Sequence, residues 1–99
     1  MLNDHPTNRS ISFAVVQNPE TRSQGRLLER EGRWADLSVA CRKPVRPGDL
    51  VEFETKQTLF LGEVDSSEPE GDGQHLRVRL EHVLDLEKTA WIQKLWDEE

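Results

Sequence analysis

Residues 51–64 read VEFETKQTLFLGEV and contain the clearest structural pattern in the chain. Over 51–56, Val51, Phe53 and Thr55 alternate with charged residues, so one face of a strand is buried and the other faces water. The following strand, over 58–64, is apolar on both faces near its start, which indicates that it is covered on both sides. Within it, Gly62 is typical of a bulge or of a close backbone approach. The stretch therefore predicts two strands packed on a core.

The same period of two recurs along most of the chain and predicts four further strands, over 11–16, 25–31, 36–41 and 75–82. Between them, 17–24 is expected to be a polar turn, 45–49 (VRPGD) a tight turn with proline and glycine, and 65–73 a mobile acidic loop. Six short, regularly spaced strands are typical of a closed barrel that protects its edges. The sequence thus predicts an all-β fold, a small six-stranded antiparallel barrel over 11–83 with a C-terminal α-helix.

Both ends of the chain differ from this pattern. Residues 1–10 lack periodicity and are expected to form an irregular leader. From Asp85, a plausible helix N-cap, the period changes to about 3.6 residues, which predicts a helix over 85–97. Trp91 and Trp96 supply too much apolar area to leave in water, so this helix should dock on the barrel or on a protein partner. The whole chain, 1–99, is expected to be a single domain.

Composition limits the classes of protein that the chain can belong to. Its 99 residues carry 13 Lys and Arg against 19 Asp and Glu, and only 34% of them are hydrophobic. The basic residues are mostly arginines in the first half, and the second half holds 13 of the acidic residues. No apolar stretch is long enough to span a membrane, and the start has no secretory signal. With Cys41 as the one cysteine, a reducing, cytoplasmic setting is expected.

The sequence predicts neither catalysis nor a bound metal or cofactor. His5, His75 and His82 fall at no metal-ligand spacing, and no nucleophile elbow or phosphate-binding glycine loop is present. Acidic residues such as Glu52 and Glu54 alternate on a strand face in water, which is ordinary solvation. Cys41 follows the inward face of a strand, where a thiol is usually inert packing.

Residues 25–64 together with 75–84 resemble the PilZ domain family. The match is best in GRLL at 25–28, VRPG at 45–48, LGEV at 61–64 and VRLE at 78–81. The resemblance implies a six-stranded barrel with a helix, and a role in bacterial signalling by cyclic di-GMP, which many members of the family bind.

Two ligand motifs of that family can be compared with this sequence position by position. In the first, RxxxR ahead of the first strand, Arg9 matches the second arginine but His5 replaces the first, and a neutral imidazole cannot make a bidentate charged contact. In the second, [D/N]xSxxG, the three motif positions are occupied by Glu29, Glu31 and Trp34. Two carboxylates and a bulky ring at these positions oppose the binding of a doubly anionic nucleotide.

A second alignment remains open. Arg22 and Arg26 form a literal RxxxR, and Asp36 begins a DxSxx run in which Cys41 replaces the glycine. Only nine residues separate Arg26 from Asp36, too few for the full strand that follows the arginine motif in the family. The candidate ligand-binding residues are Arg9, Arg22 and Arg26 from these two alignments, together with Arg33 from the same arginine-rich half of the chain.

Three functions follow from these observations. The first is a non-catalytic signalling adaptor that acts through protein contacts, with cyclic di-GMP binding weakened or lost. The second is a small-barrel RNA-binding module, supported by the arginines and Trp34 but opposed by the net charge of −6. The third is a functional cyclic di-GMP receptor that uses Arg9 or the pair Arg22 and Arg26.

Overall fold

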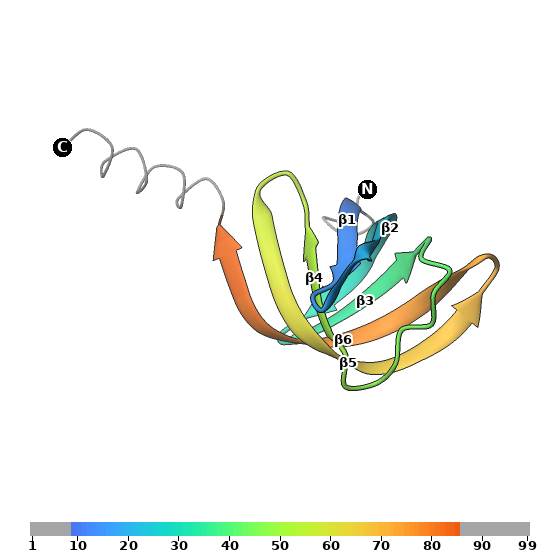
Figure 1. The fold of residues 1–99 in the computed structure, drawn as a ribbon. Coiled ribbons are helices and arrows are strands. Elements are labelled where there is room, and N and C mark those ends of the chain that lie inside the picture. The colour runs from blue at the N-terminus through green and yellow to red at the C-terminus, as the bar shows by residue number, and fades with distance from the viewer. Residues whose placement is uncertain (1–8, 86–99) are drawn as a thin grey trace, which may run out of the picture.

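The computed structural model describes residues 9–85, which form six antiparallel strands (Figure 1). The strands are β1 (Arg9–Val15), β2 (Asn18–Glu31), β3 (Trp34–Val39), β4 (Leu50–Glu54), β5 (Thr58–Glu70) and β6 (Gly73–Asp85). They close into a barrel in the order β1-β2-β3-β6-β5-β4, and β4 returns to pair with β1. The predicted six-stranded all-β barrel is confirmed. The predicted helix lies outside the described residues, apart from Asp85.

The core consists of the apolar faces that the alternation predicted. Phe13, Phe53, Leu37 and Leu76 are fully buried, and the rings of Phe53 and Phe60 stack with their centroids 4.8 Å apart. Leu76, Val78 and Leu80 of β6 all point into this core. Cys41 is also buried, as predicted. Burial of about 25 cal/mol per Å² of apolar surface makes this closed interior the main source of stability.

Two predicted features of β5 are confirmed at Gly62. The β5–β6 register shifts between Leu61 and Gly62, which is a bulge. A Cβ atom added to Gly62 would lie 2.5 Å from the carbonyl oxygen of Arg79, so the two backbones approach closely. Leu59 and Leu61 are half-buried, which fits a strand with apolar residues on both faces.

The connection between β3 and β4 is ordered by one turn and one side chain. Gly48 has a φ of +94°, and the Asp49 amide donates to the Arg46 carbonyl at 3.0 Å, as the predicted proline–glycine turn requires. The Gln74 side chain accepts a bond from the Val45 amide at 2.9 Å. It also donates to the carbonyl oxygens of Cys41 and Lys43, at 2.9 and 2.7 Å. Gln74 therefore fixes this segment across one end of the barrel.

The predicted polar turn over 17–24 is wrong, because β2 begins at Asn18 and only Val16 and Gln17 turn. The strand holds here through Thr21, which is 5% exposed. Its hydroxyl accepts a bond from the Val15 amide at 2.7 Å and donates to the Asn18 carbonyl at 2.6 Å. A buried hydroxyl with both bonds made takes the place that an apolar residue has in an alternating strand.

The predicted mobile loop over 65–73 is also wrong, because β5 continues to Glu70 and a two-residue turn at Gly71 and Asp72 leads into β6. Backbone pairing with β6 holds these polar residues in a long hairpin (Figure 1), and β6 pairs in turn with β3 from Gln74 to Arg79. Two strand ends also differ from the prediction. Arg9 and Ser10 belong to β1 and not to an irregular leader, and Asp85 ends β6 instead of beginning a helix.

Candidate ligand-binding site

The structure places the four candidate arginines on different parts of the barrel. Arg9 begins β1, Arg22 and Arg26 lie on β2, and Arg33 is in the two-residue turn between β2 and β3. Arg22 and Arg26 share a face of β2 but are four residues apart, about 13 Å along an extended strand. Arg9 pairs with Leu27, the neighbour of Arg26, so Arg9 and Arg26 belong to opposite faces of the sheet. The four guanidinium groups do not converge at one barrel opening.

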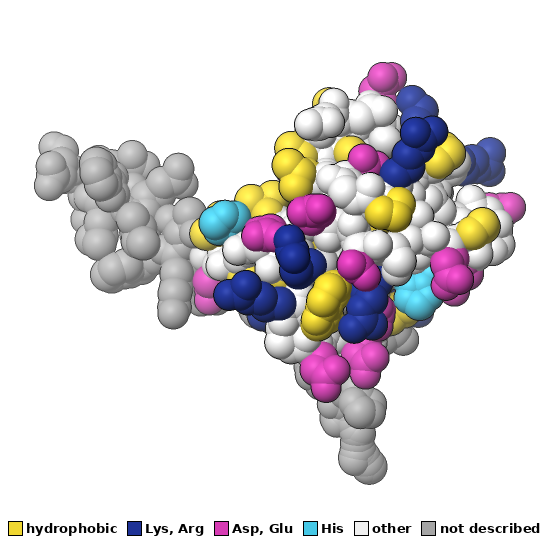
Figure 2. Space-filling view, turned by 90° about the horizontal axis from the view of Figure 1, so that it is seen from below, with side chains coloured by type: hydrophobic (Ala, Val, Ile, Leu, Met, Phe, Trp, Pro, Cys, Tyr) yellow, Lys and Arg dark blue, Asp and Glu magenta, His cyan; other side chains and the backbone are white. Residues whose placement is uncertain are grey.

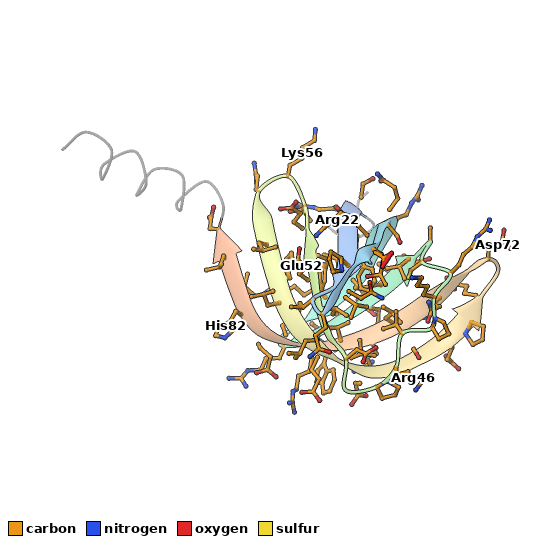
Figure 3. The ribbon with its side chains drawn as sticks, in the orientation of Figure 1. Arg22, Arg46, Glu52, Lys56, Asp72 and His82 are labelled. Atoms are coloured by element: carbon orange, nitrogen blue, oxygen red, sulfur yellow. The ribbon has the colours of Figure 1, made fainter. Side chains whose placement is uncertain are left out.

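Arg22 is occupied by neighbours on the outer surface of β1 and β4. Its guanidinium forms an ion pair with Glu52 and donates to the hydroxyl of Ser12 at 2.7 Å (Figure 3). An anion that used Arg22 would have to displace Glu52 or accept its repulsion. Because Arg22 is paired with Glu52 and lies far from Arg26, the two arginines do not form one anion-binding site.

Arg26 lines a pocket of about 470 Å³ near the tip of the β5–β6 hairpin, together with Ser38, its direct partner on β3. The second alignment of the ligand motif thus brings Arg26 and Ser38 together, while Asp36 lies elsewhere. The pocket also contains Glu70 and Asp72, and the Ser38 hydroxyl donates to Glu70 at 2.9 Å. Arg26 has an interaction partner of its own. Two carboxylates make this pocket unfavourable for a phosphate group.

Arg9 lies in a different environment, beside a gap between β1 and β4, the two strands that close the barrel. We call this junction the seam. The β1–β4 ladder ends at the pair of Ser12 and Glu54, so the first residues of β1 pair only with β2 among the described strands. The gap is a pocket of about 470 Å³, and the described residues that line it are Arg9, Ser10, Thr55, Lys56 and Gln57.

Two cations face this seam pocket, and its described lining includes no carboxylate. Lys56 and Gln57 form the turn between β4 and β5, with Lys56 at its tip (Figure 3). The turn is ordered by Thr55, whose hydroxyl accepts bonds from the amides of Gln57 and Thr58 at 3.3 and 3.2 Å. Lys56 and Gln57 were not predicted as site residues from the sequence, although a short polar turn between two alternating strands marks a loop at a barrel opening.

The positions of the second ligand motif lie at the end of the β2–β3 hairpin, where Glu29 pairs with Asp36 and Glu31 pairs with Trp34. The Arg77 guanidinium covers the Trp34 ring at 4.7 Å from its centroid. Asp36 lies 3.9 Å from Arg77. His5, which takes the place of the first motif arginine, lies outside the described residues.

Cations and carboxylates alternate on the outer surface of β3, β5 and β6, which makes this surface unfavourable for binding a nucleic acid. Arg79 pairs with Glu63 at 3.6 Å and with Glu81 at 3.2 Å, and His75 lies 4.0 Å from Asp36. The underside of the molecule shows basic and acidic side chains side by side, with no continuous basic area (Figure 2). RNA binding draws most of its affinity from phosphate contacts, which such a surface does not favour.

Within residues 9–85, no three His, Cys, Asp or Glu side chains gather in a way that could hold a metal ion. The same part of the chain contains no helix with the length and hydropathy to cross a membrane. Comparison of the chain with protein-family models, curated proteins and solved structures finds no match in any of the three.

Proposed function

We propose that this chain is a non-catalytic, PilZ-like adaptor domain of cyclic di-GMP signalling in the bacterial cytoplasm. It works through protein contacts, and its own binding of cyclic di-GMP is weakened or lost. The observation that carries the proposal is the set of side chains at the end of the β2–β3 hairpin. There the motif positions hold Glu29, Glu31 and Trp34, and Arg77 covers the Trp34 ring.

The physical argument concerns charge and space. A cyclic dinucleotide brings two phosphates, and Glu29 and Glu31 would repel them at a strand end where the family motif has a short polar side chain and a serine. Trp34 fills the place of a glycine, so a base cannot approach the backbone there. The arginines that would compensate are dispersed, and Arg22 is held by Glu52.

Isothermal titration calorimetry with cyclic di-GMP tests this proposal. We expect no binding in the micromolar range, because one guanidinium at the seam cannot replace two converging ones. The matched variants are Arg9→Ala, at the seam pocket, and Arg46→Ala, in the turn at the other end of the barrel. Micromolar binding that Arg9→Ala abolishes and Arg46→Ala preserves would contradict the proposal.

The seam pocket supports a second candidate function, a cyclic di-GMP receptor that uses Arg9. Its support is that Arg9 and Lys56 both line a pocket whose described lining has no acidic residue. This function requires Lys56→Ala to weaken binding as Arg9→Ala does, because both cations would contact phosphate. If the wild-type chain binds and Lys56→Ala does not change the affinity, the seam pocket is not the site.

The proposed partner contact through Trp91 and Trp96 lies outside the described residues and stays a prediction. Among residues 9–85, the large apolar side chains exposed to solvent are Val16, Leu50, Val83 and Leu84. Two of these, Val83 and Leu84, are neighbours near the end of β6. As consecutive residues of a strand, they lie on opposite faces of the sheet.

A further inference from the structure

The last five residues of β6 have a sheet partner on one side only. β5 pairs with β6 as far as Thr58 and Asp85. On the other side, the β3 ladder ends at Trp34 and Arg79, and the last bond runs from the Leu80 amide to the Arg33 carbonyl at 2.6 Å. No described strand covers that side of Glu81–Asp85, which we call the β6 edge. It is about 17 Å long at 3.4 Å per residue.

The β6 edge begins at the Gly62 bulge. Opposite Leu61 and Gly62, β6 contains one extra residue, Glu81, between Leu80 and His82. A bulge of this kind bends the strand and increases its twist. β6 therefore leaves β3 at Leu80 and continues as the outer strand beside β5, whose other side pairs with β4 from Leu59 to Glu63 (Figure 1).

The β6 edge has the properties of a docking strand. All five of its residues are exposed, and Val83 and Leu84 are 44% and 46% exposed. Their partners on β5 are Phe60 and Leu59, so apolar side chains lie on both faces of the sheet beside the β6 edge. Natural sheets usually protect such an edge with lysine or proline, and His82–Leu84, at its centre, has neither.

We propose that the β6 edge binds an extended segment of a partner protein, as an added antiparallel strand in which basic residues flank an apolar centre. This inference rests on the proposed function, action through protein contacts, and names the surface. Backbone hydrogen bonds to the edge would supply affinity. The apolar centre would cover Val83 and Leu84, and the basic residues would lie opposite Glu81 and Asp85.

The charges of the edge favour such a segment. Glu81 and Asp85 give the β6 edge two carboxylates and no cation of its own. Glu81 already bonds to Arg79 at 3.2 Å, and Asp85 has an interaction within the chain. Because a carboxylate accepts several hydrogen bonds, a lysine or arginine opposite each can share it.

A second copy of the chain fits the β6 edge poorly. Two identical antiparallel strands pair about a two-fold axis that sets one residue against itself. An axis at Val83 places Glu81 opposite Asp85, and like charges directly opposite are destabilising. An axis at Leu84 places Val83 opposite Asp85. Both copies also carry a net charge of −6.

An NMR titration of the full-length chain tests the proposal. The probe is the peptide acetyl-SKLVYKS-amide, and the control is acetyl-SELVYES-amide, in which glutamates replace the lysines. We expect the basic peptide to shift the amide resonances of Glu81–Asp85, and the acidic peptide to bind at least about tenfold more weakly, a difference of roughly 1.4 kcal/mol.

Matched variants distinguish binding at the β6 edge from nonspecific binding. Val83→Lys places a cation on the edge and should weaken the basic peptide by about tenfold or more. Val16→Lys alters an equally exposed valine, also 44% exposed, at the other end of the barrel, and should leave the affinity unchanged. Circular dichroism verifies that both variants are folded. Equal effects of the two variants, or shifts confined to residues away from Glu81–Asp85, would overturn the proposal.

Other occupants give different results. Self-association in sedimentation that Val83→Lys abolishes would show that a second copy covers the edge. Protection of the Glu81–Asp85 amides from exchange, lost on deletion of residues 1–8 or 86–99, would show that the chain covers its own edge. Either result rejects the proposal. Calorimetry with cyclic di-GMP does not depend on the β6 edge. The peptide titration can therefore reject the edge site while the proposed adaptor function holds, and calorimetry can reject the proposed function separately.

Discussion

Replacement of Gly62 by alanine tests the close approach of β5 and β6 at the bulge where the β6 edge begins. The new Cβ atom would lie 2.5 Å from the Arg79 carbonyl oxygen and 2.6 Å from Val78 Cγ1, whereas ordinary contact begins at 3.4 Å. Nearly 1 Å must therefore be recovered by moving a backbone group in the longest ladder of the barrel. Overpacking of this kind costs about 1–3 kcal/mol, and the lower entropy of the unfolded alanine chain returns about 0.4–1 kcal/mol.

The expected net loss for Gly62→Ala is about 1–2 kcal/mol, which lowers the melting temperature of a domain of this size by roughly 4–16 °C. Urea unfolding followed by tryptophan fluorescence measures it, with an unchanged slope if only stability is affected. Gly71→Ala is the control, because its φ of +58° costs about 1 kcal/mol while no atom lies within 4 Å. A Gly62→Ala variant as stable as the wild type, or more stable than Gly71→Ala, would refute the close approach and with it the proposed origin of the β6 edge.

Three further results are expected. Gln74→Ala removes three hydrogen bonds to the segment between β3 and β4 and should lower the free energy of unfolding in urea by about 2–3 kcal/mol. Gln74→Glu should also destabilise the protein, because a carboxylate cannot donate to the two carbonyl oxygens. A loss below about 0.5 kcal/mol for Gln74→Ala would contradict the role of Gln74 in fixing this segment. Thr21→Val strands the buried Val15 amide at nearly constant volume and should cost about 1–3 kcal/mol, so a neutral effect would mean that water reaches this amide. Arg22→Ala breaks a half-exposed pair with Glu52 and should change stability by less than about 1 kcal/mol; a larger loss would show that the pair does more than neutralise Arg22.

The sequence predicted the parts of the barrel whose side chains alternate between apolar and polar. Val51 and Phe53 on β4, and Leu76 and Val78 on β6, are buried as expected, because local burial demands this pattern. The bulge at Gly62 was predicted because a glycine inside a strand weakens it and usually marks a bulge or a close backbone approach. These features depend on a residue and its near neighbours, which a sequence displays directly.

The errors have a common physical origin. Residues 18–24 and 65–70 are strands because another strand pairs with them, and their own side chains are mostly polar. A polar segment bounded by Pro, Gly and Asp looks the same whether or not such a partner exists, since the partner is distant in sequence. The seam pocket has the same character. It exists because the β1–β4 ladder stops at Ser12, so the presence of Arg9 and Lys56 in one pocket could not be predicted from their spacing in the sequence.

The two ends of the barrel differ in structure, and the proposed binding surfaces all lie at one of them. At one end, the segment between β3 and β4 is fixed by Gln74 and buries Cys41 and Val45. The antiparallel order puts the start of β1, the β4–β5 turn and the end of β6 at the opposite end, so the seam pocket and the β6 edge both lie there. Substitutions at the Gln74 end should therefore lower the free energy of unfolding without changing the affinity for the basic peptide. Val83→Lys should lower the affinity for the basic peptide with little effect on the free energy of unfolding.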